Sequence, residues 1–310
     1  MDAVPTPLVQ DDQLLIEISA AAVNPVDWKV RDGLLRSRIR LALPVIPGGD
    51  VSGTVVAMGD RVRGFALGDP VHAMTDTRCG YACGGFAAYV AVTAAHVAPR
   101  PASLDHRGAA AVPLAALTAW QALHDEGGIA AGQRVLIHAA AGGVGGFAVQ
   151  FAREAGARVI GTASAANRDY VIGLGAHEVI DYRADRFEEM LRDIDLVLDL
   201  VGGDVQVRSF KVLRAAGTLV NAWGMLAVDA AEAAGVVARK VAVRPDGAQL
   251  KRIGALIDAG RVGVAVAHLL PLTQVEDALA LSRRGHGRGK IVVEVAPRER
   301  QADRAAVMAP

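Results

Sequence analysis

The hydrophobic and polar positions follow two different patterns along the chain. Over about the first 100 residues, short β-branched and apolar runs alternate with turns that contain glycine or proline. We expect strands there at 14–18, 51–56, 71–74, 86–92 and 96–98. Closely spaced strands of this kind predict a compact β-rich domain.

After residue 134 the pattern changes, and apolar strands alternate with helical segments of about 8 to 12 residues. The expected strands are 135–137, 158–162, 178–181, 196–200, 218–221 and 236–243. Such alternation predicts an α/β unit with right-handed crossovers and a doubly wound parallel sheet. The remaining elements break this alternation, so we expect them to return to the β-rich domain. They are a helix that ends near Gly260, a strand at 268–270, a helix at 274–282 and a strand at 290–295.

The composition limits the kinds of partner. Formal net charge is zero, so the chain lacks the excess of basic residues that nucleic acid or an anionic membrane would require. The most apolar stretch, 109–120, contains Pro113 and is shorter than the roughly 20 residues of a membrane span. Two cysteines and an acidic N-terminus without an export signal favour a reducing compartment. We therefore expect a cytoplasmic protein that binds neither nucleic acid nor a membrane.

A glycine-rich turn joins the strand at 135–137 to a helix with apolar residues at helical spacing. Gly142 and Gly143 would let the backbone approach a pyrophosphate at the helix N-terminus, and Gly145 would let the helix pack on the strand. A turn chosen only for close packing is the alternative. The strand before it and the amphipathic helix after it favour a dinucleotide site.

The end of the next strand indicates which dinucleotide is bound. NAD-binding units place an acidic residue there to hold the ribose hydroxyls, and 161–168 contains none. Thr162, Ser164 and the cation Arg168 stand there instead, and these side chains suit a 2′-phosphate. The alternative treats Ser164 as a helix N-cap and Arg168 as a solvated residue of the first turn. The sequence therefore favours NADPH.

Several motifs in this order resemble the zinc-independent quinone oxidoreductases of the medium-chain dehydrogenase/reductase superfamily. The resemblance runs from about Val4 to Val295. The motifs are Asn24-Pro-Val-Asp-Trp-Lys29, Pro47-Gly-Gly-Asp-Val-Ser-Gly-Thr-Val55, Pro113-Leu-Ala-Ala-Leu-Thr-Ala-Trp120, the glycine turn, Asp199-Leu-Val-Gly-Gly203 and Gly287-Arg-Gly-Lys-Ile-Val-Val293.

The resemblance implies a fold and a domain arrangement. A GroES-like β-barrel catalytic domain would comprise 1–110 and 244–297, a Rossmann NADPH-binding domain would comprise 111–243, and 298–310 would be a fraying tail. Members of this family usually carry another strand and turn ahead of 4–7, and without these we expect an unpaired barrel edge or a wider substrate mouth. The alternative is an upstream start codon. The family also implies a homodimer that reduces quinones or enones with NADPH.

The resemblance assigns site residues motif by motif. Asn24 and Thr118 would lie near the nicotinamide. The pyrophosphate would be held at Gly142, Gly143 and Val144. The 2′-phosphate would be held by Ser164, Arg168 and Tyr182. Val201, Asn221 and Lys290 would line the remainder of the cofactor cleft.

The sequence also argues against a catalytic metal. Zinc alcohol dehydrogenases of the same superfamily carry Cys at the position of Asn24 and Gly-His-Glu where this chain has Gly48-Gly-Asp50. Asparagine and glycine do not replace a thiolate and an imidazole as zinc ligands. Cys79 and Cys83 have no partner ligands nearby, so we expect two thiols in a loop and no metal site.

Without a metal, hydrogen-bond donors must polarise the substrate carbonyl while NADPH delivers a hydride. Asn24 is the candidate donor or orienter, and the alternative is a turn residue that caps the backbone of Asp27 or Trp28. Tyr81 and Lys29 are candidate proton donors. Two other functions stay open: a secondary-alcohol or enoyl-thioester reductase, and an NADPH-binding module without turnover, either crystallin-like or redox-sensing.

Overall fold

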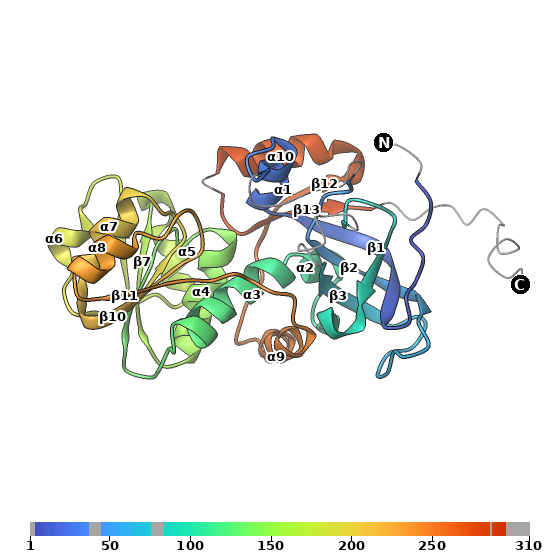
Figure 1. Cartoon of the computed structure of the whole chain (residues 1–310), viewed down its shortest axis with the longest axis horizontal. Helices are drawn as coiled ribbons and strands as arrows, with labels where there is room; N and C mark the ends of the chain where they lie inside the picture. Colours follow the sequence, from blue (N-terminus) through green and yellow to red (C-terminus); the bar gives the residue numbers. More distant parts are fainter. Residues whose placement is uncertain (1–3, 37–44, 76–83, 286, 296–310) are drawn as a thin grey trace, which may run out of the picture.

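Two β-sheets organise the computed structural model, which describes residues 4–36, 45–75, 84–285 and 287–295 (Figure 1). The first sheet has seven strands and combines both ends of the chain. Its order is β12 (Val266–Pro271), β13 (Lys290–Glu294), β1 (Gln13–Val23), β2 (Asp50–Met58), β3 (Pro70–Met74) and β5 (Val97–Pro99), with β4 (Tyr89–Thr93) also paired to β1. The prediction that the C-terminal strands return to the β-rich domain is confirmed.

Strand β1 is longer than the sequence predicted, because the expected strand ended at Ile18. The register shifts between Ile18 and Ala20, and the strand then continues through Val23. Alanine has a low strand propensity. Residues 20–22 are nevertheless fully buried. Ala20 and Ala22 pack with Ala110 and Val292, and Ala21 belongs to the core of the first sheet, so tertiary packing decides their conformation.

The second sheet has six strands, and every described pair within it is parallel. Its order is β11 (Val237–Lys240), β10 (Leu213–Asn221), β9 (Ile194–Asp199), β6 (Arg134–Ile137), β7 (Arg158–Ala163) and β8 (Glu178–Asp181). The chain moves outward from β6 to β8, then crosses to β9 on the other side of β6. This is the doubly wound order of a Rossmann sheet, and it confirms the predicted fold class.

Helices cover both faces of this sheet (Figure 1). They are α4 (Gly143–Glu154), α5 (Arg168–Gly173), α6 (Phe187–Met190), α7 (Asp204–Phe210) and α8 (Val228–Ala233). The predicted length of the connecting helices was wrong for most of them, since α5 and α8 have six residues and α6 has four. Turns and loops fill the rest of each crossover. Two apolar clusters, one on each face of the sheet, form the core of this part.

The remaining helices connect or cover the two sheets. The helix α3 (Pro113–Trp120) continues as a π-helix, Gln121–Glu126, and packs against α4 and against α9 (Gly247–Asp258). Figure 1 shows α3 between the two sheets. The helices α1 (Pro25–Arg31) and α10 (Val275–Arg284) pack together over the first sheet, and α2 (His106–Ala110) covers β1 and β2. The predicted domain boundaries at 110 and 243 stay predictions, although each sheet falls on the expected side of them.

Within the described residues, no helix is both long and apolar enough to cross a membrane.

Candidate active site

A cleft of about 430 Å³ lies where the two sheets meet. Three segments far apart in the sequence supply most of its lining: the end of β1 with the start of α1, the glycine turn before α4, and the segment from α10 to β13. Residues of α3, of β12 and just after the end of β9 complete the lining. The cleft is at the carboxyl end of β6, next to β9, where the strand order of the Rossmann sheet reverses. Ligands of doubly wound sheets bind in this position.

The glycines of the turn have two different structural roles. A Cβ on Gly145 would lie 2.2 Å from the Ala139 carbonyl oxygen, so this glycine is required by packing. A Cβ on Gly142 would meet nothing closer than 3.3 Å. Packing therefore does not require glycine at Gly142, which lines the cleft as the N-cap of α4. An open backbone at a helix N-terminus is what a pyrophosphate needs.

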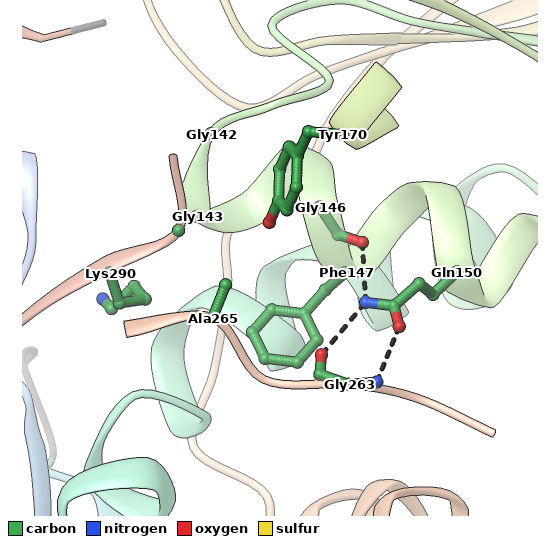
Figure 2. Close-up of a pocket in the computed structure, with 10 residues that line it drawn as sticks. Gly142, Gly143, Gly146, Phe147, Gln150, Tyr170, Gly263, Ala265 and Lys290 are labelled. Atoms are coloured by element: carbon green, nitrogen blue, oxygen red, sulfur yellow. Dashed lines mark hydrogen bonds between the residues drawn. The ribbon is translucent and has the colours of Figure 1, made fainter. Parts of the chain in front are cut away.

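The segment before β13 lies against the glycine turn. The Gly289 N–H donates to the Ala141 carbonyl at 3.2 Å, and a Cβ on Gly143 would lie 2.9 Å from Lys290 Cδ. Figure 2 shows Gly142, Gly143 and Lys290 around a small cavity of about 10 Å³ beside this contact. The first-sheet domain thus contributes directly to the wall of the predicted pyrophosphate site.

A glutamine joins the two domains beside the same cavity. Gln150 of α4 donates to the carbonyls of Gly146 and Gly263, at 3.0 and 3.1 Å. Its Oε1 accepts from the Gly263 N–H at 2.6 Å (Figure 2). All the polar atoms of this buried amide are therefore used to hold α4 against the segment that leads to β12.

The cleft floor carries a buried polar cluster that we call the lysine cluster: Asn24, Asp50 and Lys290. Lys290 is 5% exposed, and its Nζ donates to the Val23 carbonyl and to Asp50 Oδ2, both at 3.2 Å, and to Asn24 Oδ1. The other oxygen of Asp50 accepts from the Leu114 N–H at 2.6 Å. A positive charge is therefore fixed at the floor of the cleft by three oxygens of the chain.

The side-chain amide of Asn24 is bonded within the chain. Its Nδ2 donates to Asp50 Oδ2 at 2.8 Å and lies 3.5 Å from the Ala22 carbonyl, and its Oδ1 accepts from Lys290. The helix start is held differently, by the Asn24 N–H donating to Asp27 Oδ2 at 2.7 Å. Both polar atoms of the Asn24 amide are thus engaged by Lys290 and Asp50, and its role near the nicotinamide stays a prediction.

Two titratable residues of α1 have shifted pKa values, and Asp27 is the one next to this cluster. Burial raises the pKa of Asp27 to about 7, with a smaller contribution from the Asp50 carboxylate, while the Asn24 N–H opposes the shift. Burial lowers the pKa of Lys29 to about 8. Lys29 Nζ lies 3.0 Å from the centroid of the Trp223 ring, on the loop after β10. The other predicted proton donor, Tyr81, lies outside the described residues, as do Cys79 and Cys83.

A second polar group stands at the ends of β9 and β10. Asp199 accepts from the N–H groups of Val201 and Gly202 and from the amide of Asn221, at 2.8 to 2.9 Å. Asn221 is fully buried, and its Oδ1 has no hydrogen-bond partner among the described residues. A buried acceptor without a donor is costly, so this oxygen is a candidate for a hydrogen bond that the described residues do not supply. The sequence interpretation gave Asp199 no role, although an acid before Gly-Gly at a strand end was visible.

The residues predicted at the 2′-phosphate follow β7 and β8. Ser164 begins the 3₁₀ turn Ala165–Asn167, which we call the β7 turn, and its hydroxyl makes no capping bond there. Arg168 Nη1 donates to the Val179 carbonyl of β8 at 2.9 Å, and Tyr182 is 46% exposed. Thr162 does not join them, because its hydroxyl lies against His138 Nδ1 in the Rossmann core.

Thr118, predicted near the nicotinamide, is almost fully buried in α3. Its hydroxyl donates to the Leu114 carbonyl one turn earlier, at 2.7 Å. The side chain therefore has its proton engaged within the helix, and only the remaining lone pair of the hydroxyl is available to a ligand.

Within the part of the chain that the structure describes, no group of three or more His, Cys, Asp or Glu side chains could hold a metal ion. Lys290 forms a buried ion pair with Asp50 at the cleft floor. The fold and the cleft together define a two-domain nicotinamide-dependent oxidoreductase, with a catalytic sheet on one side and a dinucleotide sheet on the other.

Comparison with known proteins identifies the family. A family model described as alcohol dehydrogenase GroES-like domain matches residues 10–102, and one described as zinc-binding dehydrogenase matches 174–293. The chain is 33% identical to the chloroplast envelope quinone oxidoreductase homolog of Arabidopsis thaliana, over 94% of this chain and 92% of that one. It is 33% identical to 2-methylene-furan-3-one reductase of Solanum lycopersicum, over 95% and 74%.

Comparison with solved structures points to the same family. The quinone oxidoreductase from Coxiella burnetii superposes with a TM-score of 0.85 at 32% identity, covering 94% of this chain and 93% of that chain. A mycobacterial protein complexed with NADPH superposes with a TM-score of 0.82 at 27% identity, covering 96% and 94%. The chain belongs to the zinc-independent quinone oxidoreductase family of the medium-chain dehydrogenase/reductase superfamily.

Proposed function

We propose that the protein is an NADPH-dependent, metal-free reductase that transfers a hydride to a quinone or an α,β-unsaturated carbonyl compound. The observation that carries this proposal is the cleft itself. An open glycine turn forms one wall, and the buried ammonium group of Lys290 forms the floor. Relatives named as quinone oxidoreductase, alkenal/one oxidoreductase and furanone reductase support the same substrate class.

The residues present fit the cofactor at both ends. Gly142, Gly143 and Val144 would hold the pyrophosphate at the start of α4, where the backbone is open at Gly142. The unpartnered Oδ1 of Asn221 would accept a hydrogen bond from the nicotinamide end, beside Val201, Thr118 and Lys290. Ser164, Arg168 and Tyr182 would hold the 2′-phosphate. When bound, the cofactor supplies the hydride.

The side chains of the protein would stabilise the charge that develops on the substrate during hydride transfer. As a carbonyl compound accepts a hydride, negative charge develops on its oxygen, and a fixed cation in a dry site stabilises that charge strongly. Lys290 is such a cation, because Asn24 and Asp50 hold its ammonium group in one place. Lys29 is our candidate proton donor for an enolate, since a pKa of about 8 suits proton transfer near neutral pH. A hydroquinone anion can take its proton from water.

A substrate panel tests this function. The purified protein is mixed with NADPH and, in separate assays, with a naphthoquinone, an alkenal, an enoyl thioester and, in the reverse direction with NADP⁺, a secondary alcohol. We expect consumption of NADPH with the quinone or the alkenal, unchanged by EDTA. Activity that requires added zinc, or turnover confined to the alcohol or thioester, contradicts the proposal. Tight NADPH binding without turnover on the whole panel favours a binding module instead.

Two further expectations belong with this proposal. The homodimer and the cytoplasmic location predicted from the sequence stay predictions, and sedimentation of the purified protein tests the first. The names of relatives include chloroplastic and mitochondrial forms, so the family occurs in more than one compartment.

A further inference from the structure

An arginine of the first-sheet domain reaches across to the Rossmann domain. Arg288 lies two residues before β13, and its Nε donates to Asn167 Oδ1 at 2.6 Å. Its Nη2 donates to the Ala166 carbonyl, and its guanidinium carbon lies 5.7 Å from the centroid of the Tyr170 ring. Asn167 and Ala166 belong to the β7 turn. The arginine is therefore held on the turn that follows the second strand of the dinucleotide sheet.

This turn is where a Rossmann domain distinguishes its cofactors. An acidic residue at the end of the second strand binds the ribose 2′-hydroxyl in NAD-binding proteins, and a nearby arginine accommodates a 2′-phosphate. The β7 turn carries no acid, and the Ser164 hydroxyl at its start makes no capping bond. A guanidinium group on this turn stands where the phosphate charge of NADPH would lie.

The guanidinium group of Arg288 has N–H donors available to a ligand. Two of the five N–H groups of its guanidinium bind the turn, which leaves three for other acceptors. The side chain is exposed, and it has no carboxylate partner among the described residues. Arg168, by contrast, directs one Nη group to the Val179 carbonyl of β8. Arg288 is thus an uncompensated cation whose planar fork matches a phosphate.

We propose that Arg288 binds the 2′-phosphate of NADPH, alongside Arg168, and so contributes to the selection of NADPH over NADH. This inference rests on the proposed function, because it specifies the residues of the same cofactor site. It also assigns to the catalytic domain a part of cofactor selection, since Arg288 comes from the segment that leads into the first sheet.

The experiment measures nucleotide binding by Arg288→Gln and Arg288→Lys, without turnover. Calorimetry or nicotinamide fluorescence gives dissociation constants for NADPH and NADH, and 2′,5′-ADP and 5′-AMP serve as matched probes of the adenosine end. For Arg288→Gln we expect the affinity for NADPH and 2′,5′-ADP to fall about ten- to a hundredfold, because charged hydrogen bonds to the phosphate are lost. NADH and 5′-AMP should change by less than about threefold.

Two comparisons sharpen the result. Arg288→Lys should bind NADPH with intermediate affinity, because an ammonium group keeps the positive charge but lacks the paired planar N–H donors of a guanidinium group. Arg158→Gln is the control, since Arg158 is exposed at the opposite end of β7, and it should bind both nucleotides normally.

Three outcomes overturn the inference. Equal losses for NADPH and NADH would show that Arg288 only holds the turn in shape, and unchanged affinity for both would show that it does not touch the cofactor. In either case the proposed function stands if the unmodified protein still reduces quinones with NADPH. Failure of the unmodified protein to bind either nucleotide removes both proposals together.

Discussion

The buried carboxyl group of Asp27 makes the stability of this protein depend on pH in a direction that can be worked out. Its pKa is about 7 in the folded chain, mainly because burial penalises the charged form, and about 3.8 when the chain is unfolded. Between these values the unfolded chain releases the proton while the folded chain retains it. The free energy of unfolding therefore falls as pH rises through this window.

The size of the effect follows from the shift of about three pKa units. Each unit corresponds to about 1.4 kcal/mol, so the contribution of Asp27 should decrease by about 4 kcal/mol between pH 4 and pH 8. Asp27→Asn removes the titration and leaves an oxygen that can accept from the Asn24 N–H. Relative to the unmodified protein, this variant should therefore gain about 4 kcal/mol across the same range.

Urea unfolding followed by tryptophan fluorescence measures this difference at each pH, and Trp28 lies next to the mutated residue. Comparison at the same pH cancels the titrations that the two proteins share. The control is Asp60→Asn, because Asp60 is exposed and the difference from the unmodified protein should stay constant. A difference for Asp27→Asn that stays constant within about 1 kcal/mol, or that moves in the opposite direction, refutes the reasoning.

Two more predictions concern the cleft. Gly145→Ala should destabilise the fold by roughly 1–3 kcal/mol, because the new Cβ would lie 2.2 Å from the Ala139 carbonyl oxygen. Gly142→Ala should keep the thermal midpoint of the unmodified protein but bind NADPH more weakly. A stable Gly145→Ala together with an unstable Gly142→Ala would contradict the assignment of packing to Gly145 and cofactor binding to Gly142. Lys290→Met should lose at least tenfold in kcat and about 3–5 kcal/mol of stability, because it leaves Asp50 buried without its partner. Adding Asp50→Asn should restore stability but not kcat, and recovery of both would remove the electrostatic role of Lys290.

The sequence predicted the elements whose pattern is local. The alternation of strands and helices predicted the Rossmann sheet, and the glycine turn predicted where the cleft opens. It did not predict that β1 continues through Val23, because the alanines of that segment are strand residues only in their buried surroundings. It also grouped Thr162 with the phosphate residues, since a hydroxyl after an apolar run does not reveal which face of the sheet it occupies.

The contacts that define the site are non-local, which is why sequence patterns left them open. Asn24 is at the start of a short helix, and its partner Lys290 is 266 residues away. Arg288 meets Asn167 across 121 residues. Spacing within one segment carries no information about such pairs, because they form only when the C-terminal strands add to the first sheet beside β1. Residues 283–290 form a basic, glycine-rich segment, and such segments are ordinarily solvated. The sequence alone therefore did not show which of its side chains contact the rest of the protein.

The three consecutive residues 288–290 connect every part of the proposed cofactor site. Arg288 lies on the β7 turn, the Gly289 N–H binds the glycine turn, and Lys290 places its charge on the cleft floor. Because the three residues are consecutive, none of these contacts can shift far without disturbing the other two. We therefore expect recognition of the phosphate end and polarisation of the carbonyl to be linked through this segment.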